Sequence, residues 1–150
     1  MTDVELASRK DVYWEIYCKK IAIEAKVLSD LTTNHIIPVA IRSQNILLEN
    51  VRSLKEIYGS ADFKKIAKSQ LDLIECISED ISSAESYVDQ LDELEQKISK
   101  MEMGRDEAVA YHDEIAPMLE KIRKHVDSLE MTVDDQMWPL PKYRELLFIH

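Results

Sequence analysis

Apolar residues recur every three or four positions along most of this chain, which is the period of an amphipathic α-helix. The longest of these runs predicts one helix over residues 61–103, which Gly104 ends. A second run predicts a helix over residues 106–135, with Pro117 kinking it or delaying its start. The inner positions of this second run step strictly by four and three residues, as in a coiled-coil heptad. They are Ala108, His112, Ile115, Leu119, Ile122, Val126, Leu129 and Val133.

The first segment, residues 4–58, shows mostly helical spacing with one interruption. Pro38 lacks a backbone N–H and crowds the turn before it, so we expect a kink or a short break near residues 32–38. Gly59 stands where a helix C-cap is expected, and it separates this segment from the next.

These segments predict an all-α protein, an elongated bundle of long helices. Residues 61–103 alone would form a helix about 65 Å long at about 1.5 Å per residue. The helices of residues 61–135 are joined by a short turn and are expected to pair as an antiparallel hairpin. The kinked helix of residues 4–58 would pack along or across them. Residues 137–150, dense in aromatic and apolar residues, predict a short C-terminal strap, so residues 1–150 form a single helical domain.

Composition agrees with few, long elements, because the 150 residues include only 2 Gly and 4 Pro. The net charge of −10 lies unevenly, since residues 1–60 hold 8 basic and 8 acidic residues and the acidic excess falls in residues 61–150. We therefore expect a solvated acidic hairpin and a neutral first segment that packs against something. An acidic chain repels phosphate groups, so neither nucleic acid nor an anionic membrane surface is an expected partner.

The cysteines and the N-terminal sequence predict a cytoplasmic protein. Cys18 and Cys76 lie far apart and form no C-x-x-C motif, which favours free thiols. The N-terminus lacks the basic and apolar regions of a signal peptide. No apolar run approaches the about 20 residues that a membrane span requires.

Four histidines are the first candidates for chemistry: His35, His112, His125 and His150. Zinc sites on helices use H-E-x-x-H, which is absent. Di-iron bundles use Glu-x-x-His, but Thr32, Val109 and Ile122 stand three residues before the first three histidines. His112 falls on the heptad seam, where a lone histidine is more often a packing residue than a ligand. We predict no catalytic, cofactor-binding or metal-binding residue in this chain.

The tail offers stronger candidates, because Trp, Tyr and Arg are the usual anchors of protein interfaces. Two interpretations stay open: a strap that covers the open end of the bundle, or a docking strip for another domain or subunit. The first helix adds two aromatic residues. The interface candidates are Trp14, Tyr17, Trp138, Leu140, Tyr143 and Arg144.

Two strings of residues carry a resemblance to a known family. One is Asn-His-Ile-Ile-Pro-Val-Ala-Ile-Arg at 34–42, continued by Glu-Asn-Val-Arg-Ser-Leu-Lys-Glu-Ile at 49–57. The other is Trp-Pro-Leu-Pro-Lys-Tyr-Arg-Glu-Leu-Leu-Phe at 138–148, and it is the more specific because so long a string rarely recurs by chance. Both resemble the C-terminal region of type III glutamine synthetases. The likeness covers nearly the whole chain, and Ser43 departs from it where an aromatic residue is expected.

The resemblance implies a parent enzyme that joins ammonia to glutamate at the expense of ATP, with divalent metals such as Mg²⁺, and that assembles as stacked rings. Its catalytic machinery lies in β-rich regions upstream, so no catalytic residue is carried over to this chain. The resemblance therefore implies a non-catalytic helical domain for structural support or subunit assembly. Its partners would be the rest of the parent chain and neighbouring subunits, and it would hold no cofactor of its own.

Two other functions remain open. A free-standing acidic coiled-coil adaptor would self-associate through the seam of residues 108–133, and its mass in solution would exceed that of one chain. A bundle enzyme would use the histidines, and in its metal-dependent form it would contain stoichiometric metal.

Overall fold

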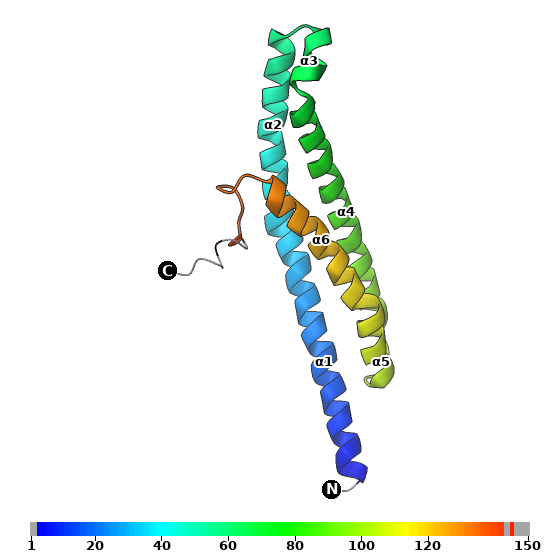
Figure 1. Cartoon of the computed structure of the whole chain (residues 1–150). Coiled ribbons are helices and arrows are strands. Elements are labelled where there is room, and N and C mark those ends of the chain that lie inside the picture. The colour runs from blue at the N-terminus through cyan, green and yellow to red at the C-terminus, as the bar shows by residue number, and fades with distance from the viewer. Residues whose placement is uncertain (1–2, 143–144, 146–150) are drawn as a thin grey trace.

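A computed structural model describes residues 3–142 and residue 145, and those residues form helices, turns and extended stretches without a strand. The helices lie side by side as an elongated bundle (Figure 1), which confirms the predicted all-α class.

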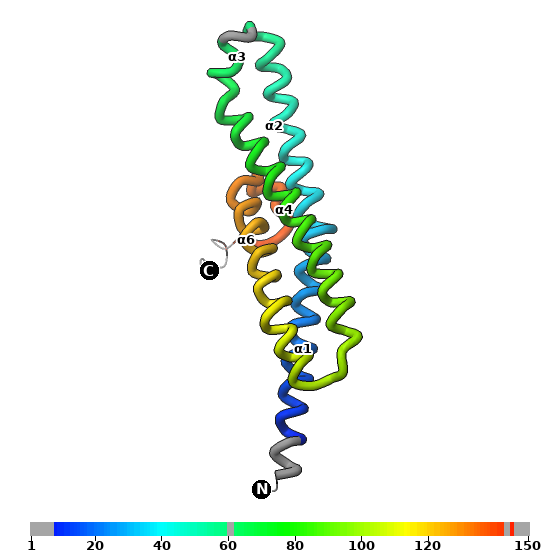
Figure 2. The backbone as a smooth tube through the Cα atoms, turned by 90° about the vertical axis from the view of Figure 1, so that its right-hand side faces the viewer, coloured from blue at the N-terminus to red at the C-terminus, as the bar shows by residue number. Residues whose placement is uncertain are grey.

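The first segment is one long helical rod. It consists of α1 (Asp3–Leu31), a π-helical turn η1 (Thr32–Ile36) and α2 (Ile37–Ile57). The rod changes direction where α1 passes through η1 into α2 (Figures 1 and 2). The sequence predicts a kink or a short break near residues 32–38, and the helix continues there without a break. It widens there into a π-turn instead, with the Ile37 N–H donating to Thr32 O.

The π-turn explains how the helix tolerates a proline. A proline ring in a regular α-helix collides with the carbonyl four residues earlier, which for Pro38 belongs to Asn34 inside η1. A π-turn holds one extra residue and widens the backbone there. The same arrangement occurs at Pro117, whose preceding turn η2 (Tyr111–Ile115) is also π-helical. Pro38 and Pro117 each stand in the first turn of the helix that follows.

The later helices differ in their bounds from the sequence prediction. The helix predicted over residues 61–103 is two helices, α3 (Ser60–Ile66) and α4 (Lys68–Ile98), and a turn occupies residues 99–104. The helix predicted over residues 106–135 comprises α5 (Arg105–Ala110), η2 and α6 (Ala116–Thr132). Val133 already has an extended backbone.

The bundle has two halves of different thickness. In the lower half, α1, α4 and the run from α5 to α6 lie side by side (Figures 1 and 2). In the upper half only α2 and α4 continue, with α3 at their tip, because α6 ends about half-way along the molecule (Figure 1). The tail after α6 leaves its end on the side of α2 and turns back along the bundle (Figure 1).

Two hydrophobic clusters hold the helices together. The lower cluster joins α1, α4, α5 and α6, and its most buried members include Ala25, Leu91, Ile115 and Ile122. The second, which we call the tail cluster, joins η1, α2, α4, the end of α6 and the tail. Its buried members are Ile36, Val39, Ala40, Ile77, Leu129, Val133 and Trp138. Full burial of one such aliphatic side chain contributes about 1.5–3 kcal/mol.

The heptad seam points inward except at one position. His112 is exposed, and its neighbour Tyr111, only 6% exposed, takes the inward position. The reason is η2, which shifts the register of the helix by adding a residue to one turn. His112 is therefore not buried on the seam, although its ring still lies against that of Tyr17.

Candidate functional site

The aromatic candidates of the first helix, Trp14 and Tyr17, lie on the inner face of α1. Both are partly buried and pack against the lower cluster. Tyr17 Oη lies 3.2 Å from His112 Nδ1, so this pair links α1 to η2 across the bundle. These two residues contact other helices of the same chain.

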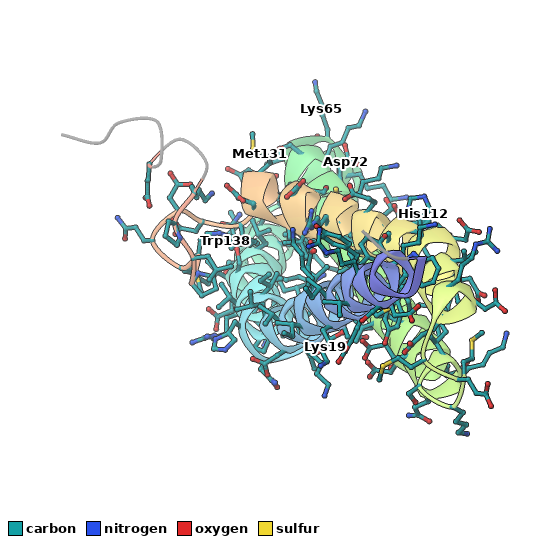
Figure 3. All side chains as sticks on the ribbon, turned by 90° about the horizontal axis from the view of Figure 1, so that it is seen from below. Lys19, Lys65, Asp72, His112, Met131 and Trp138 are labelled. Atoms are coloured by element: carbon teal, nitrogen blue, oxygen red, sulfur yellow. The ribbon has the colours of Figure 1, made fainter. Side chains whose placement is uncertain are left out.

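The tail covers the second cluster. Trp138 is 8% exposed and belongs to the tail cluster, and the half-buried Leu140 packs against the same residues. Figure 3 shows Trp138 where the tail passes over the bundle. Residues 133–142 therefore lie over the bundle as a strap, and this described part of the tail packs at mid-length and covers no open end. Tyr143 and Arg144, the other two tail candidates, lie outside the described residues.

Lys142 fixes the strap to the end of α6. Its Nζ donates to the backbone carbonyls of Glu130 at 2.6 Å and Val133 at 3.4 Å, and it pairs with Asp135 Oδ1 at 2.5 Å. The same Nζ lies 5.9 Å from the centroid of the Trp138 ring. The last carbonyls of a helix lack partners within it and carry partial negative charge, so an ammonium group stabilises them.

A polar group lies between α4 and α6. His125 Nδ1 is 2.8 Å from Asp80 Oδ1, and the two side chains are 22% and 12% exposed. The Tyr87 ring stacks on His125 at 5.7 Å between centroids. Cys76 Sγ donates to Asp80 Oδ2 at 3.8 Å. This arrangement places the carboxylate, not the imidazole, next to the thiol, so it lacks the base that a cysteine nucleophile requires.

Neither cysteine has the properties of a reactive thiol. Burial raises the pKa of Cys18, and the charge of Glu107 adds to the effect. Burial also raises the pKa of Cys76, helped by the negative charge of Asp80. The nucleophile is the thiolate, so a raised pKa lowers the fraction of cysteine able to react.

The structure does not gather the histidines into one site. His35 is exposed on η1, His112 contacts Tyr17, and His125 contacts Asp80. His150 lies outside the described residues. Among the described residues, no three His, Cys, Asp or Glu side chains converge as metal ligands do.

The outer face of α1 was not singled out from the sequence, although the sequence contains the pattern. Four apolar residues there are exposed by half or more: Val12 at 50%, Ile16 at 57%, Ile23 at 64% and Val27 at 52%. Val12 and Ile23 are 11 residues apart, and so are Ile16 and Val27. Eleven residues complete just over three full turns, so the four side chains form a nearly straight stripe. We call these four residues the outer stripe.

The outer stripe lies opposite the core-facing side of α1. Successive residues rotate by 100° around a helix, and the stripe is about half a turn from Ala25, which is fully buried. Lys19 and Lys20 are exposed on either side of it. A long apolar stripe on an exposed helix face is a feature of surfaces that meet another protein surface.

The comparisons with known proteins identify this sequence. Residues 1–55 match the family described as "Glutamine synthetase C-terminal domain". Over 146 residues the chain is 42% identical to a glutamine synthetase of Bacteroides fragilis (strain YCH46), covering 97% of this chain and 20% of that protein. Over 149 residues it is 29% identical to a type-3 glutamine synthetase of Dictyostelium discoideum, covering 99% of this chain and 20% of that protein. The chain thus spans about a fifth of the length of these relatives.

Residues 1–55 of this chain match the glutamine synthetase C-terminal domain, and nearly the whole chain is similar to part of the two glutamine synthetases. The match confirms the resemblance carried by residues 34–57 and 138–148. Within this glutamine synthetase domain, residues 1–55 span α1, η1 and most of α2, so the outer stripe lies inside the matched region. Across the described residues, no helix combines the length and apolarity needed to cross a bilayer.

Proposed function

We propose that this chain is a non-catalytic C-terminal domain of a type III glutamine synthetase. Its role is to brace the parent enzyme, with the outer stripe of α1 packed against the rest of the parent chain. The parent would be a ligase that joins ammonia to glutamate with ATP and Mg²⁺ bound outside this domain. The chain's length, about a fifth of the relatives it matches, supports a partner within the same polypeptide.

The observation that carries the proposal is the exposure of the outer stripe on a helix whose other face is already packed. Ile16 and Ile23 are more than half exposed, while Ala25 and Cys18 on the inner face are buried. Covering the stripe would remove apolar area from water, and each square ångström contributes about 25 cal/mol. The neutral charge of residues 1–60 leaves that contact without a large repulsion.

A coiled-coil adaptor is less well supported. Ile115, Leu119, Ile122 and Leu129, four of its seam residues, are at most 3% exposed. They pack against the other helices of the same chain. The seam is therefore already occupied and presents no surface to a second coil.

The test uses the parent enzyme with Ile16→Asp and Ile23→Asp together. We expect loss of assembly, measured by sedimentation, with glutamine formation falling as assembly fails. The 150-residue chain with the same substitutions should keep its helicity and its unfolding midpoint, which excludes misfolding as the cause. The matched control adds the same two charges on the outer face of α4, Ser82→Asp with Ser86→Asp, and should leave assembly intact. Normal assembly of the parent enzyme that carries both substitutions would refute the proposed bracing role.

The non-catalytic assignment has its own test. Calorimetry of the isolated chain with ATP or glutamate should show no heat of binding. Saturable binding of either ligand at a defined stoichiometry would contradict the proposal.

A further inference from the structure

The upper tip of the bundle, residues 52–68 at the connection of α2 to α3 and α4, combines exposed apolar side chains with positive charge. Ile57 is 73% exposed, Tyr58 42% and Ile66 41%. Ile57, Tyr58 and Phe63 help to line an open hollow of about 540 Å³, together with the charged residues Lys55, Glu56 and Lys64. The basic residues outnumber the acidic residues Glu56 and Asp62: they are Arg52, Lys55, Lys64, Lys65 and Lys68. Figure 3 shows Lys65 extending away from the bundle.

The lower turn, residues 99–104 between α4 and α5, has the complementary character. Met103 is 71% exposed and Met101 41%. Glu102 and Asp106 are exposed beside them. Residues 93–114 around the turn contain seven acidic and three basic residues, so the surrounding field is negative although Lys100 and Arg105 are nearby.

We propose that the upper tip of one copy receives the lower turn of a second copy. The side chain of Met103 would enter the hollow lined by Ile57 and Tyr58, while Glu102 and Asp106 approach the lysines of the tip. Methionine suits this role because its unbranched, flexible thioether fits irregular apolar hollows. Opposite charge on the two surfaces selects this pairing over tip with tip or turn with turn.

The positions of the two surfaces explain why the occupant is another copy. The upper tip and the lower turn lie towards opposite ends of the long axis (Figure 1), so one chain cannot bring its own two surfaces together. Copies arranged head to tail can satisfy both surfaces at once. Such a contact joins different patches, and it closes into a ring or extends as a chain depending on the rotation between copies.

The contact is expected to be weak between isolated chains. A hairpin tip buries less area than the about 1,200–2,000 Å² of a stable interface. Its effect grows when copies are already held near each other, because the effective concentration then replaces the bulk concentration. The tip and the turn are separate surfaces from the outer stripe of α1.

The experiment uses sedimentation velocity on the 150-residue chain at increasing concentration, up to the millimolar range. We expect reversible self-association of the wild type that weakens at high salt. One variant reverses the charge of the two tip lysines, Lys55→Glu with Lys64→Glu. Another reverses the charge of the two acidic residues of the turn, Glu102→Lys with Asp106→Lys. Each alone should self-associate at least about tenfold more weakly. Mixed together, they should associate again, because the unaltered tip of one variant meets the unaltered turn of the other, and the two reversed surfaces also carry opposite charge.

Controls separate this contact from other causes. Glu79→Lys with Glu85→Lys makes the same charge change as the turn variant but in the middle of α4, and it should keep wild-type association. Ile16→Asp with Ile23→Asp, the outer-stripe variant, should keep it as well, so failure of the brace and failure of the tip contact are distinguishable. A wild type that stays monomeric at the highest concentration overturns the inference. So does a mixture of the two reversed variants that forms no complex.

Discussion

The outer faces of α1 and α4 both point away from the core, yet their residues differ. On α1 the outer stripe is apolar, with Ile23 64% exposed. On α4 the outward positions are mainly polar and acidic, including Glu75, Glu79, Asp89 and Glu93, all exposed. The two helices have nearly the same length, 29 and 31 residues, so the contrast is one of side chains.

The contrast shows that α4 is a regular amphipathic helix, with one apolar and one polar side, whereas α1 is not. α4 has one apolar side, buried against α2 and α6, and one acidic side suited to water. α1 has apolar residues on two opposite sides, and the described chain covers only the inner one. The tail shows that this chain can cover exposed apolar surface itself, since Trp138 does so at the tail cluster.

The largest expected effect on stability comes from changing isoleucine to alanine at a buried position, which we compare with the same change on the outer stripe. Ile77→Ala, on the buried side of α4 at 0% exposure, should lower the free energy of unfolding by about 2–5 kcal/mol. Ile23→Ala, on the outer stripe, should change it by less than about 0.5 kcal/mol in the isolated chain. Urea unfolding measures both. Equal losses of unfolding free energy would show that the outer stripe is covered within the isolated chain. The contrast between α1 and α4 would then be wrong.

The strap provides the next test. Trp138→Ala should cost about 3 kcal/mol, because the ring fills the tail cluster. Trp138→Phe should cost less than half of that, since it keeps an aromatic ring and removes an indole N–H that meets no acceptor among the described residues. Urea unfolding separates the two, and a Phe variant as unstable as the Ala variant would contradict this account of the ring.

A smaller effect concerns the acidic half of the molecule. Burial raises the pKa of Glu95, reinforced by the charge of Asp92, and burial also raises that of Asp127, with repulsion from Glu130. The folded chain then binds more protons than the unfolded chain at pH values between the ordinary and the raised pKa of each group. Stability should therefore rise as the pH is lowered from neutral through the raised pKa values. Thermal unfolding measures the slope. Asp127→Asn should flatten it, and an unchanged slope would remove Asp127 from the explanation.

The smallest effect is expected on the outer face of α4. Glu79→Gln with Glu85→Gln should change the unfolding free energy by less than about 0.5 kcal/mol, because exposed charges contribute little. Circular dichroism during urea titration is sufficient to measure it. A loss larger than about 1 kcal/mol would mean that this face is not simply solvated.

Much of the fold was predictable because it depends on local periodicity. The inner positions of residues 108–133 follow from their steps of three and four, and all except His112 point inward. The exception arose from η2, because a π-turn leaves no mark in the hydrophobic pattern and only Pro117 hints at it. The break at Ala67 between α3 and α4 was likewise missed, since no glycine or proline stands there.

The candidate surfaces were harder to predict than the helices. Trp14 and Tyr17 were chosen for their residue type, but the structure places both against the lower cluster. Val12, Ile16 and their partners on the stripe have ordinary residue types, and only their common exposure distinguishes them. Asp80 was missed because its partner His125 is 45 residues away in the sequence.

The sequence by itself determined the helices, their approximate order and the family, because helix formation depends on near neighbours and the family strings are contiguous. Only the tertiary structure decided which apolar side of α1 is covered, where the strap lies and which ends of the bundle stay exposed. Those features depend on contacts between residues far apart in the chain. A helix with two apolar sides gives no local indication of which one its neighbours will bury.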